Sequence, residues 1–272
     1  MNEVLGTFRT SDGTEHFTRA WLNDNPRYDV LLVHGLGEHS GRWAGPMSHL
    51  VARGASVHTF DVRGHGETPG PRISIDKFED LHTDISEIAE ATAASTGRPW
   101  VLYGHSLGGL QSTGYLIDGH SPQPNIAVLS APALSADVPP ILRVMAAIFG
   151  RIAPGLRVDN SIDGDQLSKD PAVGEKYFAD PLVETKATAK FGKLVFDEQA
   201  RLDGLHGSIT TPTFVIHGAD DPLVPPAASA GLAESDSVER KLYPTLRHEL
   251  HNEPEGPDVM NDVADWIEGK LF

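Results

Sequence analysis

The chain has 272 residues, enough for one large α/β domain or two small ones, and its 39% hydrophobic content supports a sizeable core. Lysine and arginine total 22 against 38 acidic residues, and this formal charge of −16 argues against a nucleic-acid partner and against binding to anionic membranes by charge alone. The chain contains no cysteine, which excludes disulfides, thiolate chemistry and cysteine-based zinc sites. It also shows neither a signal-like start nor an apolar run of ~18 residues, so we expect a cytoplasmic protein.

The first half of the chain predicts strands that alternate with helices. Two β-rich segments flank the turn at 11–13 and predict a hairpin. "YDVLLVHG" (28–35) is an apolar run that ends in glycine, as is typical of a buried strand. A helix is expected over 41–53, followed by a strand in "ASVHTFDVRGHG". The next helix is expected over 74–95, where apolar residues recur at a period close to 3.6 and Ser74 is the expected N-cap.

The alternation continues to the C-terminus with one long interruption. The further predicted elements are strands in "RPWVLYGH", "PNIAVLSAPAL", "TPTFVIHG" and "SVERKLYP", and helices over 106–117, near 226–235 and over 257–272. This order predicts an α/β fold with a mostly parallel sheet of eight strands and helices on both faces. Residues 135–205 are too many for a loop, so we predict a helical insertion over the sheet edge between core segments 1–134 and 206–272.

A serine lies among glycines in "VLYGHSLGGL". Gly104 to Gly108 fit the pattern Gly-x-Ser-x-Gly between a predicted strand and a predicted helix. Such a turn lifts the hydroxyl above the sheet, and glycine on both sides lets strand and helix crowd together. The new helix also directs its free N–H groups at the serine. Ser106 is therefore the predicted nucleophile; an ordinary glycine-rich turn is the structural alternative, and no phosphate-loop pattern is present.

A nucleophilic serine needs a base, and the base needs an orienting acid. Asp220 and Asp221 follow one predicted strand, while His248 and His251 follow the next, so all lie where parallel strands end. We prefer Asp221, which precedes a proline and is biased to extended geometry. We prefer His248 because it lies nearer its strand, although a solvated loop residue is the alternative for either histidine.

An oxyanion hole is expected from the segment "HGLG" (34–37), which leaves a strand near the serine turn. The backbone N–H groups of Leu36 and Leu107 are the predicted donors. His34 and His105 flank the site and are expected to form structural hydrogen bonds. No histidines show the His-Glu-x-x-His spacing, so no metal site is expected from them.

These features together resemble the α/β-hydrolase superfamily and, within it, the monoacylglycerol lipase and lysophospholipase group. The similar stretches are "HGLGEHSGRW", "DVRGHGET", "GHSLGG", "LSKDPAV…ADPLV", "HGADDPLVP" and "RHELHNEPE". The resemblance implies a catalytic triad of Ser106, Asp221 and His248. It also implies that Glu38 and Arg42 help to place a glycerol head, although both are equally candidates for a structural ion pair.

The resemblance further implies that the insertion is a cap. One face of its first helix is apolar and predicts either contact with acyl chains and lipid surfaces or packing within the cap itself. The residues of that face assigned to substrate binding are Ile141, Met145, Ile148 and Phe149.

The predicted function is cofactor-free hydrolysis of monoacylglycerols, a small lipid ester substrate, through an acyl-enzyme. A general carboxylesterase or lysophospholipase with the same triad is the nearest alternative, and a perhydrolase or peptidase would also keep the serine. A non-catalytic binding protein is the alternative of a different class. Transient contact of the cap with lipid would make the protein peripheral to a membrane.

Overall fold

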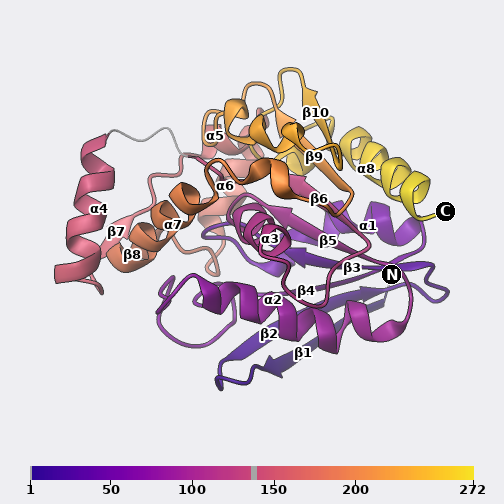
Figure 1. Ribbon diagram of the computed structural model, residues 1–272, viewed down its shortest axis with the longest axis horizontal. Helices are drawn as coiled ribbons and strands as arrows, with labels where there is room; N and C mark the ends of the chain where they lie inside the picture. The colour runs from indigo at the N-terminus through magenta and orange to yellow at the C-terminus, as the bar shows by residue number, and fades with distance from the viewer. Residues whose placement is uncertain (1, 136–139) are drawn as a thin grey trace.

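An eight-stranded sheet forms the centre of the computed structural model, which describes residues 2–135 and 140–272 (Figure 1). The strand order is β1-β2-β4-β3-β5-β6-β9-β10. β2 pairs antiparallel with β1 and β4, and the other neighbours are parallel. The predicted mostly parallel sheet is therefore confirmed. The strands are β1 (Asn2–Arg9), β2 (Glu15–Leu22), β3 (Tyr28–Val33), β4 (Ala55–Phe60), β5 (Trp100–His105), β6 (Ile126–Ser130), β9 (Thr213–Gly218) and β10 (Val238–Tyr243).

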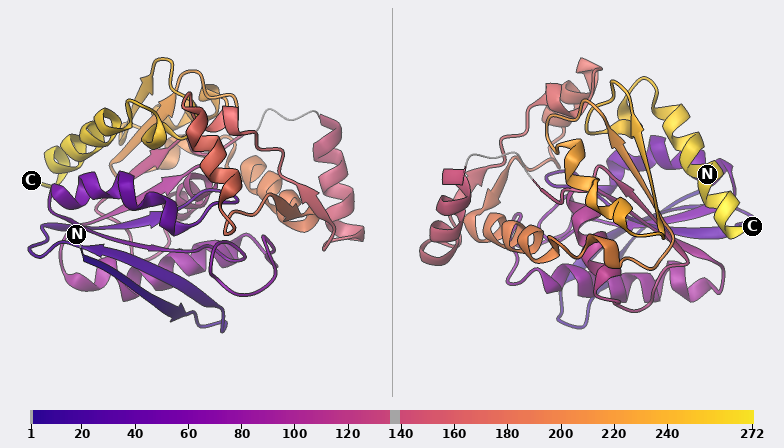
Figure 2. Two further views of the ribbon diagram at one scale, coloured as in Figure 1. Left: turned by 180° about the vertical axis from the view of Figure 1, so that it is seen from behind. Right: turned by 45° about the horizontal axis from the view of Figure 1, so that its top comes forward.

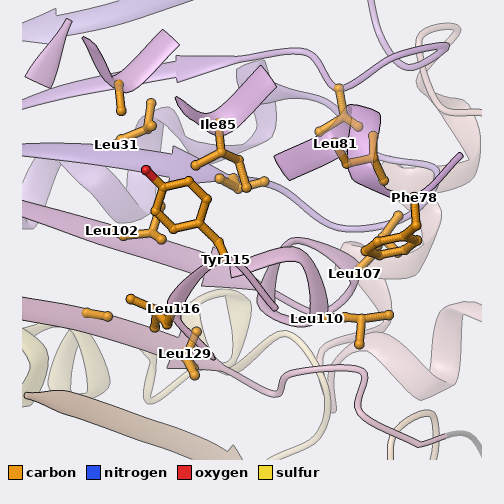
Figure 3. Close-up of a cluster of buried hydrophobic side chains, with 14 of the residues drawn as sticks. Leu31, Phe78, Leu81, Ile85, Leu102, Leu107, Leu110, Tyr115, Leu116 and Leu129 are labelled. Atoms are coloured by element: carbon orange, nitrogen blue, oxygen red, sulfur yellow. The ribbon is translucent and has the colours of Figure 1, made fainter. Parts of the chain in front are cut away.

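Helices cover both faces of this sheet because successive strand side chains point to opposite sides. On one face Val30 and Leu32 of β3 pack with α1 (Ala44–Ala52) and α8 (Gly256–Leu271). On the other face Leu31 joins the cluster formed with α2 (Glu79–Ala91) and α3 (Leu107–Ile117). In Figure 3, Leu31, Ile85 and Leu102 gather around the ring of Tyr115. The nearly continuous apolar sequence of the inner strands follows from this double burial.

Two local predictions were wrong. The helix expected from Ser74 begins at Glu79, with Phe78 at the N-cap position. Ile73 is held instead by backbone hydrogen bonds with Gly64 and Thr188, so the apolar residues that follow it enter the core from a loop. The helix expected near 226–235 consists of two short 3-10 helices, Pro226–Ser229 and Gly231–Glu234.

The segment between β6 and β9 contains more than helices. Its elements are α4 (Pro140–Ile152), β7 (Arg157–Asp159), α5 (Gly164–Leu167), α6 (Pro171–Ala179), β8 (Lys186–Thr188) and α7 (Ala189–Leu202), and β7 and β8 form a small antiparallel sheet. The predicted start of the first helix at 138–139 lies outside the described residues. Figures 1 and 2 show α4 at the outer edge of the molecule, beyond α7. None of the helices in the described ranges combines the length and the apolar character that a membrane span requires.

Candidate active site

Ser106 lies in a strained turn between β5 and α3. Its backbone has φ 52° and ψ −115°, an unusual conformation for a residue that carries a side chain. Two contacts hold the turn: the Ser106 amide donates to the Ser130 carbonyl at 3.0 Å, and the Ser106 carbonyl accepts from Ala133 at 3.0 Å. The hydroxyl thus stands at the carboxyl end of the sheet, where the sequence predicts it.

The glycines on either side of Ser106 are required by close backbone contacts. A Cβ on Gly108 would lie 2.1 Å from the carbonyl oxygen of Val33, and a Cβ on Gly104 would lie 2.6 Å from the carbonyl oxygen of Gly108. A Cβ on Gly35 would lie 3.1 Å from the Cβ of Ser106. The glycines therefore let α3 press against the end of β3 and bring the segment after β3 to the serine.

His248 connects Ser106 with Asp221 through two short hydrogen bonds. The His248 Nε2 lies 2.8 Å from the Ser106 Oγ, and its Nδ1 lies 2.7 Å from the Asp221 Oδ2. All three residues are buried, with Ser106 8% exposed. Asp220, in contrast, is exposed. The structure therefore places Asp221 against His248 and leaves Asp220 outside the cluster.

The carboxylate of Asp221 has more partners than the histidine alone. Its Oδ1 accepts hydrogen bonds from the amides of Leu223 and Val224, both at 2.9 Å, and its Oδ2 lies 3.2 Å from the Nε2 of His217. Burial alone would raise the pKa of Asp221, but the charge of His248 and these hydrogen bonds lower it strongly. The acid is therefore ionised at neutral pH and fixed in orientation.

The same pair sets the protonation of His248. Burial opposes its positive charge, but the Asp221 carboxylate outweighs burial and raises the pKa of His248 above its ordinary value of 6.5. The neighbouring His105 has no such carboxylate, and burial together with His248 lowers its pKa well below 6.5. A positive charge in this cluster is thus concentrated on His248, the ring that contacts the serine.

The segment after β3 presents two backbone amides beside the serine turn. Leu36 lies in this segment, and Leu107 begins α3 directly after Ser106. Within the described part of the chain, neither amide donates a hydrogen bond. Tyr177 and Glu184 hold the segment from the other side: a Cβ on Gly37 would lie 2.6 Å from the Tyr177 hydroxyl, and the Glu184 amide donates to the Gly37 carbonyl at 2.9 Å. The amides are free to bind an anionic oxygen.

Glu38 and Arg42 belong to a buried ion network. Glu38 accepts hydrogen bonds from the Gly35 amide at 2.6 Å and from Arg42 at 2.9 Å. Arg42 binds both carboxylate oxygens of Glu249, at 2.7 and 2.9 Å. Because Glu249 directly follows His248, the network connects the segment after β3 with the loop that carries His248. These contacts favour the structural alternative for Glu38 and Arg42.

Sequence reasoning missed three residues of this site: His217, Glu249 and Tyr177. The position of His217 four residues before Asp221 was a usable signal, because both lie at the same strand end. Glu249 and Tyr177 meet Arg42 only through the fold, and no local pattern marks them; the guanidinium lies 4.8 Å from the Tyr177 ring.

The other flanking histidines have structural contacts. The His34 Nε2 accepts from the Val62 amide at 3.0 Å, and its Nδ1 lies 2.8 Å from the Gly35 carbonyl oxygen. His251 stacks on Trp43 with ring centroids 3.9 Å apart. The structure thus places His248, and not His251, against the serine.

The residues predicted to bind substrate through α4 lie on an exposed face. Ile141 is 61% exposed, Met145 42% and Ile148 49%, whereas Phe149 is half-buried. The helix packs on α7, where a Cβ on Gly150 would lie 2.7 Å from the Cβ of Lys193. The apolar face is not buried in a core of the insertion.

Comparison with known proteins gives similarities that span nearly the whole chain. A family model described as serine aminopeptidase, S33, matches residues 24–255. The sequence is 34% identical to a monoacylglycerol lipase of Mycolicibacterium smegmatis, over 92% of each chain. The structure of a Paleococcus ferrophilus monoacylglycerol lipase aligns with a TM-score of 0.82 at 30% identity, over 99% of this chain and 100% of that one. A soluble variant of monoglyceride lipase from Saccharomyces cerevisiae, solved with a substrate analog, aligns with a TM-score of 0.89 at 25% identity, over 100% of this chain and 96% of that one.

Proposed function

Because the chain belongs to the serine aminopeptidase S33 family of the α/β-hydrolase superfamily, we propose that it is a serine ester hydrolase that cleaves monoacylglycerols to fatty acid and glycerol. The observation that carries the proposal is the hydrogen-bonded chain from Ser106 through His248 to Asp221. The relatives named monoacylglycerol lipase support the substrate class.

The geometry supports a two-step reaction. Ser106 Oγ attacks the ester carbonyl carbon while His248 Nε2 takes the hydroxyl proton, and Asp221 stabilises the imidazolium. The amides of Leu36 and Leu107 hold the negative oxygen of the tetrahedral intermediate. Its collapse breaks the bond to glycerol, which leaves with the proton of His248. Water then attacks the acyl-Ser106 with His248 as base, and the fatty acid is released as Ser106 recovers its proton.

The first test separates an enzyme from a binding protein. A fluorophosphonate is expected to label Ser106 in the wild-type protein and not in Ser106→Ala, and this variant is expected to lose about 10⁶-fold in kcat. A Ser106→Ala protein with near-native esterase rates would overturn the mechanism.

The second test concerns the substrate. We expect kcat/KM for a medium-chain monoacylglycerol to exceed that for the methyl ester of the same acid roughly 10- to 100-fold, since two glycerol hydroxyls bound in the site contribute ~1–3 kcal/mol. Equal values would favour a general carboxylesterase. Faster cleavage of an aminoacyl amide than of either ester would favour the peptidase alternative that the family description includes.

We further propose that residues 135–205 act as a cap on core segments 1–134 and 206–272, and that the exposed face of α4 meets lipid acyl chains. Six large apolar side chains of one 13-residue helix are exposed, an unusual concentration for a surface without a partner. With a net charge of −16, binding through apolar area rather than charge is expected. The six exposed residues are Ile141, Leu142, Val144, Met145, Ile148 and Ile152.

Flotation with vesicles of zwitterionic phosphatidylcholine, which has no net charge, tests this contact. The double variant Ile141→Ser with Ile148→Ser is expected to lose vesicle binding while it keeps its rate on a short, water-soluble ester. Leu205→Ser is a matched control, because Leu205 is 41% exposed outside α4. Unchanged flotation of the α4 variant would contradict lipid contact at this face.

A further inference from the structure

Two histidines and a glutamate meet at the end of α3 that lies away from Ser106. Glu79 and His82 lie in the first turn of α2, and His120 lies in the turn that follows α3. One ligand atom from each residue lies within 4.8 Å of the others. Ser106 precedes the opposite end of this 11-residue helix, ~16 Å away along its axis, so the cluster is separate from the candidate active site.

The distances in this cluster are long for hydrogen bonds. The Glu79 Oε2 lies 3.4 Å from the Nδ1 of His82, and the Glu79 Oε1 lies 3.5 Å from the Nε2 of His120. Hydrogen bonds of this kind are usually ~2.7–3.0 Å long. In contrast, ligand atoms bound tetrahedrally to zinc at ~2.0–2.1 Å lie ~3.3–3.5 Å from one another. Each of these two separations matches one edge of such a coordination shell, and each involves a different oxygen of the Glu79 carboxylate.

The ring of His82 directs its Nδ1 toward Glu79 and its Nε2 toward Glu198. His82 is 1% exposed, and a neutral imidazole offers one lone pair to a metal ion. When Nδ1 is the ligand atom, the proton resides on Nε2, which faces the Glu198 carboxylate at 3.8 Å. At this distance Glu198 does not hydrogen-bond the ring, and both of its carboxylate oxygens accept hydrogen bonds from Arg201.

The Nε2 atoms of both histidines are buried and have no hydrogen-bond partner in the described part of the chain. The Nε2 of His120 faces Glu79, and the Asp118 carboxylate lies 3.8 Å away. Tyr115 stacks on the His120 ring with centroids 5.4 Å apart, which fixes its direction. Unsatisfied buried nitrogens are costly, and a bound cation would satisfy the nitrogen that faces Glu79.

We propose that Glu79, His82 and His120 bind a divalent transition-metal ion of the zinc class. Two imidazoles and one carboxylate favour such an ion over calcium or magnesium, which prefer oxygen ligands. The site would join the start of α2 to the end of α3 and stabilise the fold. Sequence patterns did not reveal it, because His120 is distant from Glu79 and His82 in the chain, and the predicted absence of a metal site rested on local spacing.

Titration of the chelator-treated protein with Zn²⁺ tests the proposal by calorimetry and thermal unfolding. We expect one Zn²⁺ per chain and a rise in Tm on binding. His120→Ala and Glu79→Gln are expected to weaken binding at least about 10- to 100-fold and to abolish the Tm rise. Both positions are partly exposed, so these variants are expected to fold, and their ester hydrolysis is expected to match that of the wild type.

Two control variants test whether Zn²⁺ binds at this site and not at another histidine or in the candidate active site. His49→Ala removes a partly buried histidine from α1, and Ser106→Ala inactivates the candidate nucleophile; both are expected to bind Zn²⁺ as the wild type does. The proposal is overturned if the wild type binds no Zn²⁺, or if His120→Ala and Glu79→Gln bind it as tightly as the wild type. Ester hydrolysis can fail without affecting this result.

Discussion

At the scale of single residues, the acid of the site is more firmly held than its sequence neighbour. Asp221 accepts hydrogen bonds from two backbone amides and faces two histidines, whereas Asp220 is exposed. Proline after Asp221 and the end of β9 before it place the carboxylate toward His248. The turn after β9 thus buries the carboxylate of Asp221 and leaves that of the adjacent Asp220 in solvent.

This difference leads to a matched pair of variants. Asp221→Asn is expected to lower kcat by about 10⁴-fold, because an amide stabilises the wrong imidazole tautomer and cannot balance the imidazolium. Asp220→Asn is expected to retain nearly the wild-type rate. Initial rates with a soluble ester measure both, and equal losses in the two variants would contradict the assignment of Asp221.

The pH dependence of catalysis follows from the environment of His248. The ring must be neutral to accept the proton of Ser106, and its pKa is raised above 6.5. We therefore expect kcat/KM to be low in acid and to increase with pH through a midpoint above 6.5, measured between about pH 5 and 9. In Asp221→Asn burial is no longer outweighed, so the midpoint of the residual activity should move to lower pH. An unchanged midpoint would show that another group controls the rate.

At the scale of elements, the serine turn is a contact between three backbones. β5, α3 and the end of β3 approach so closely that Gly104 and Gly108 leave no room for side chains. The strain at Ser106 is therefore maintained by packing on both sides of the turn.

Replacing a crowded and an uncrowded glycine by alanine separates the effect of steric crowding on stability from the effect of helix propensity. Gly108→Ala is expected to destabilise the fold by about 1–3 kcal/mol, because its Cβ would meet the Val33 carbonyl oxygen. Gly192→Ala in α7 has no atom within 4 Å of its Cβ and is expected to stabilise the protein by ~0.5–1 kcal/mol. Urea denaturation measures both. A neutral Gly108→Ala would mean that α3 can move away from β3 at little cost.

At the scale of the whole molecule, a buried ion network connects the two halves of the sheet. Arg42 follows β3, and Glu249 follows β10 at the far edge. The side chains of Glu38, Arg42 and Glu249 are at most 11% exposed, so their charges depend on one another. The network lowers the pKa of Glu249 to about 2 despite its burial.

Removal of the central cation tests whether this network is structural. Arg42→Ala is expected to destabilise the protein by about 3–5 kcal/mol, since two buried carboxylates lose their partner. Arg9→Ala, which removes an exposed pair with Glu15, is expected to change stability by less than ~1 kcal/mol. Denaturant unfolding and KM are measured together. Unchanged stability with a raised KM would instead assign Arg42 to the glycerol head.

Much of the site could be predicted because its signals are local. The glycines around Ser106 indicate a crowded turn, and the apolar runs indicate buried strands. The carboxyl ends of parallel strands meet at one edge of a sheet. The order of Ser106, Asp221 and His248 along the chain therefore predicts their convergence without knowledge of any side-chain contact. The fold class follows from the same alternation of strands and helices.

Contacts between distant segments have no such local signal. Glu249, which binds Arg42 through both carboxylate oxygens, is 207 residues away from it in the chain. His120 meets Glu79 only because α2 and α3 lie side by side on one face of the sheet. Hydrophobic periodicity likewise showed that α4 has an apolar face but not whether that face is covered. Local sequence encodes backbone conformation and the direction of apolar side chains, whereas the packing of whole elements decides which polar groups meet and which apolar faces remain exposed.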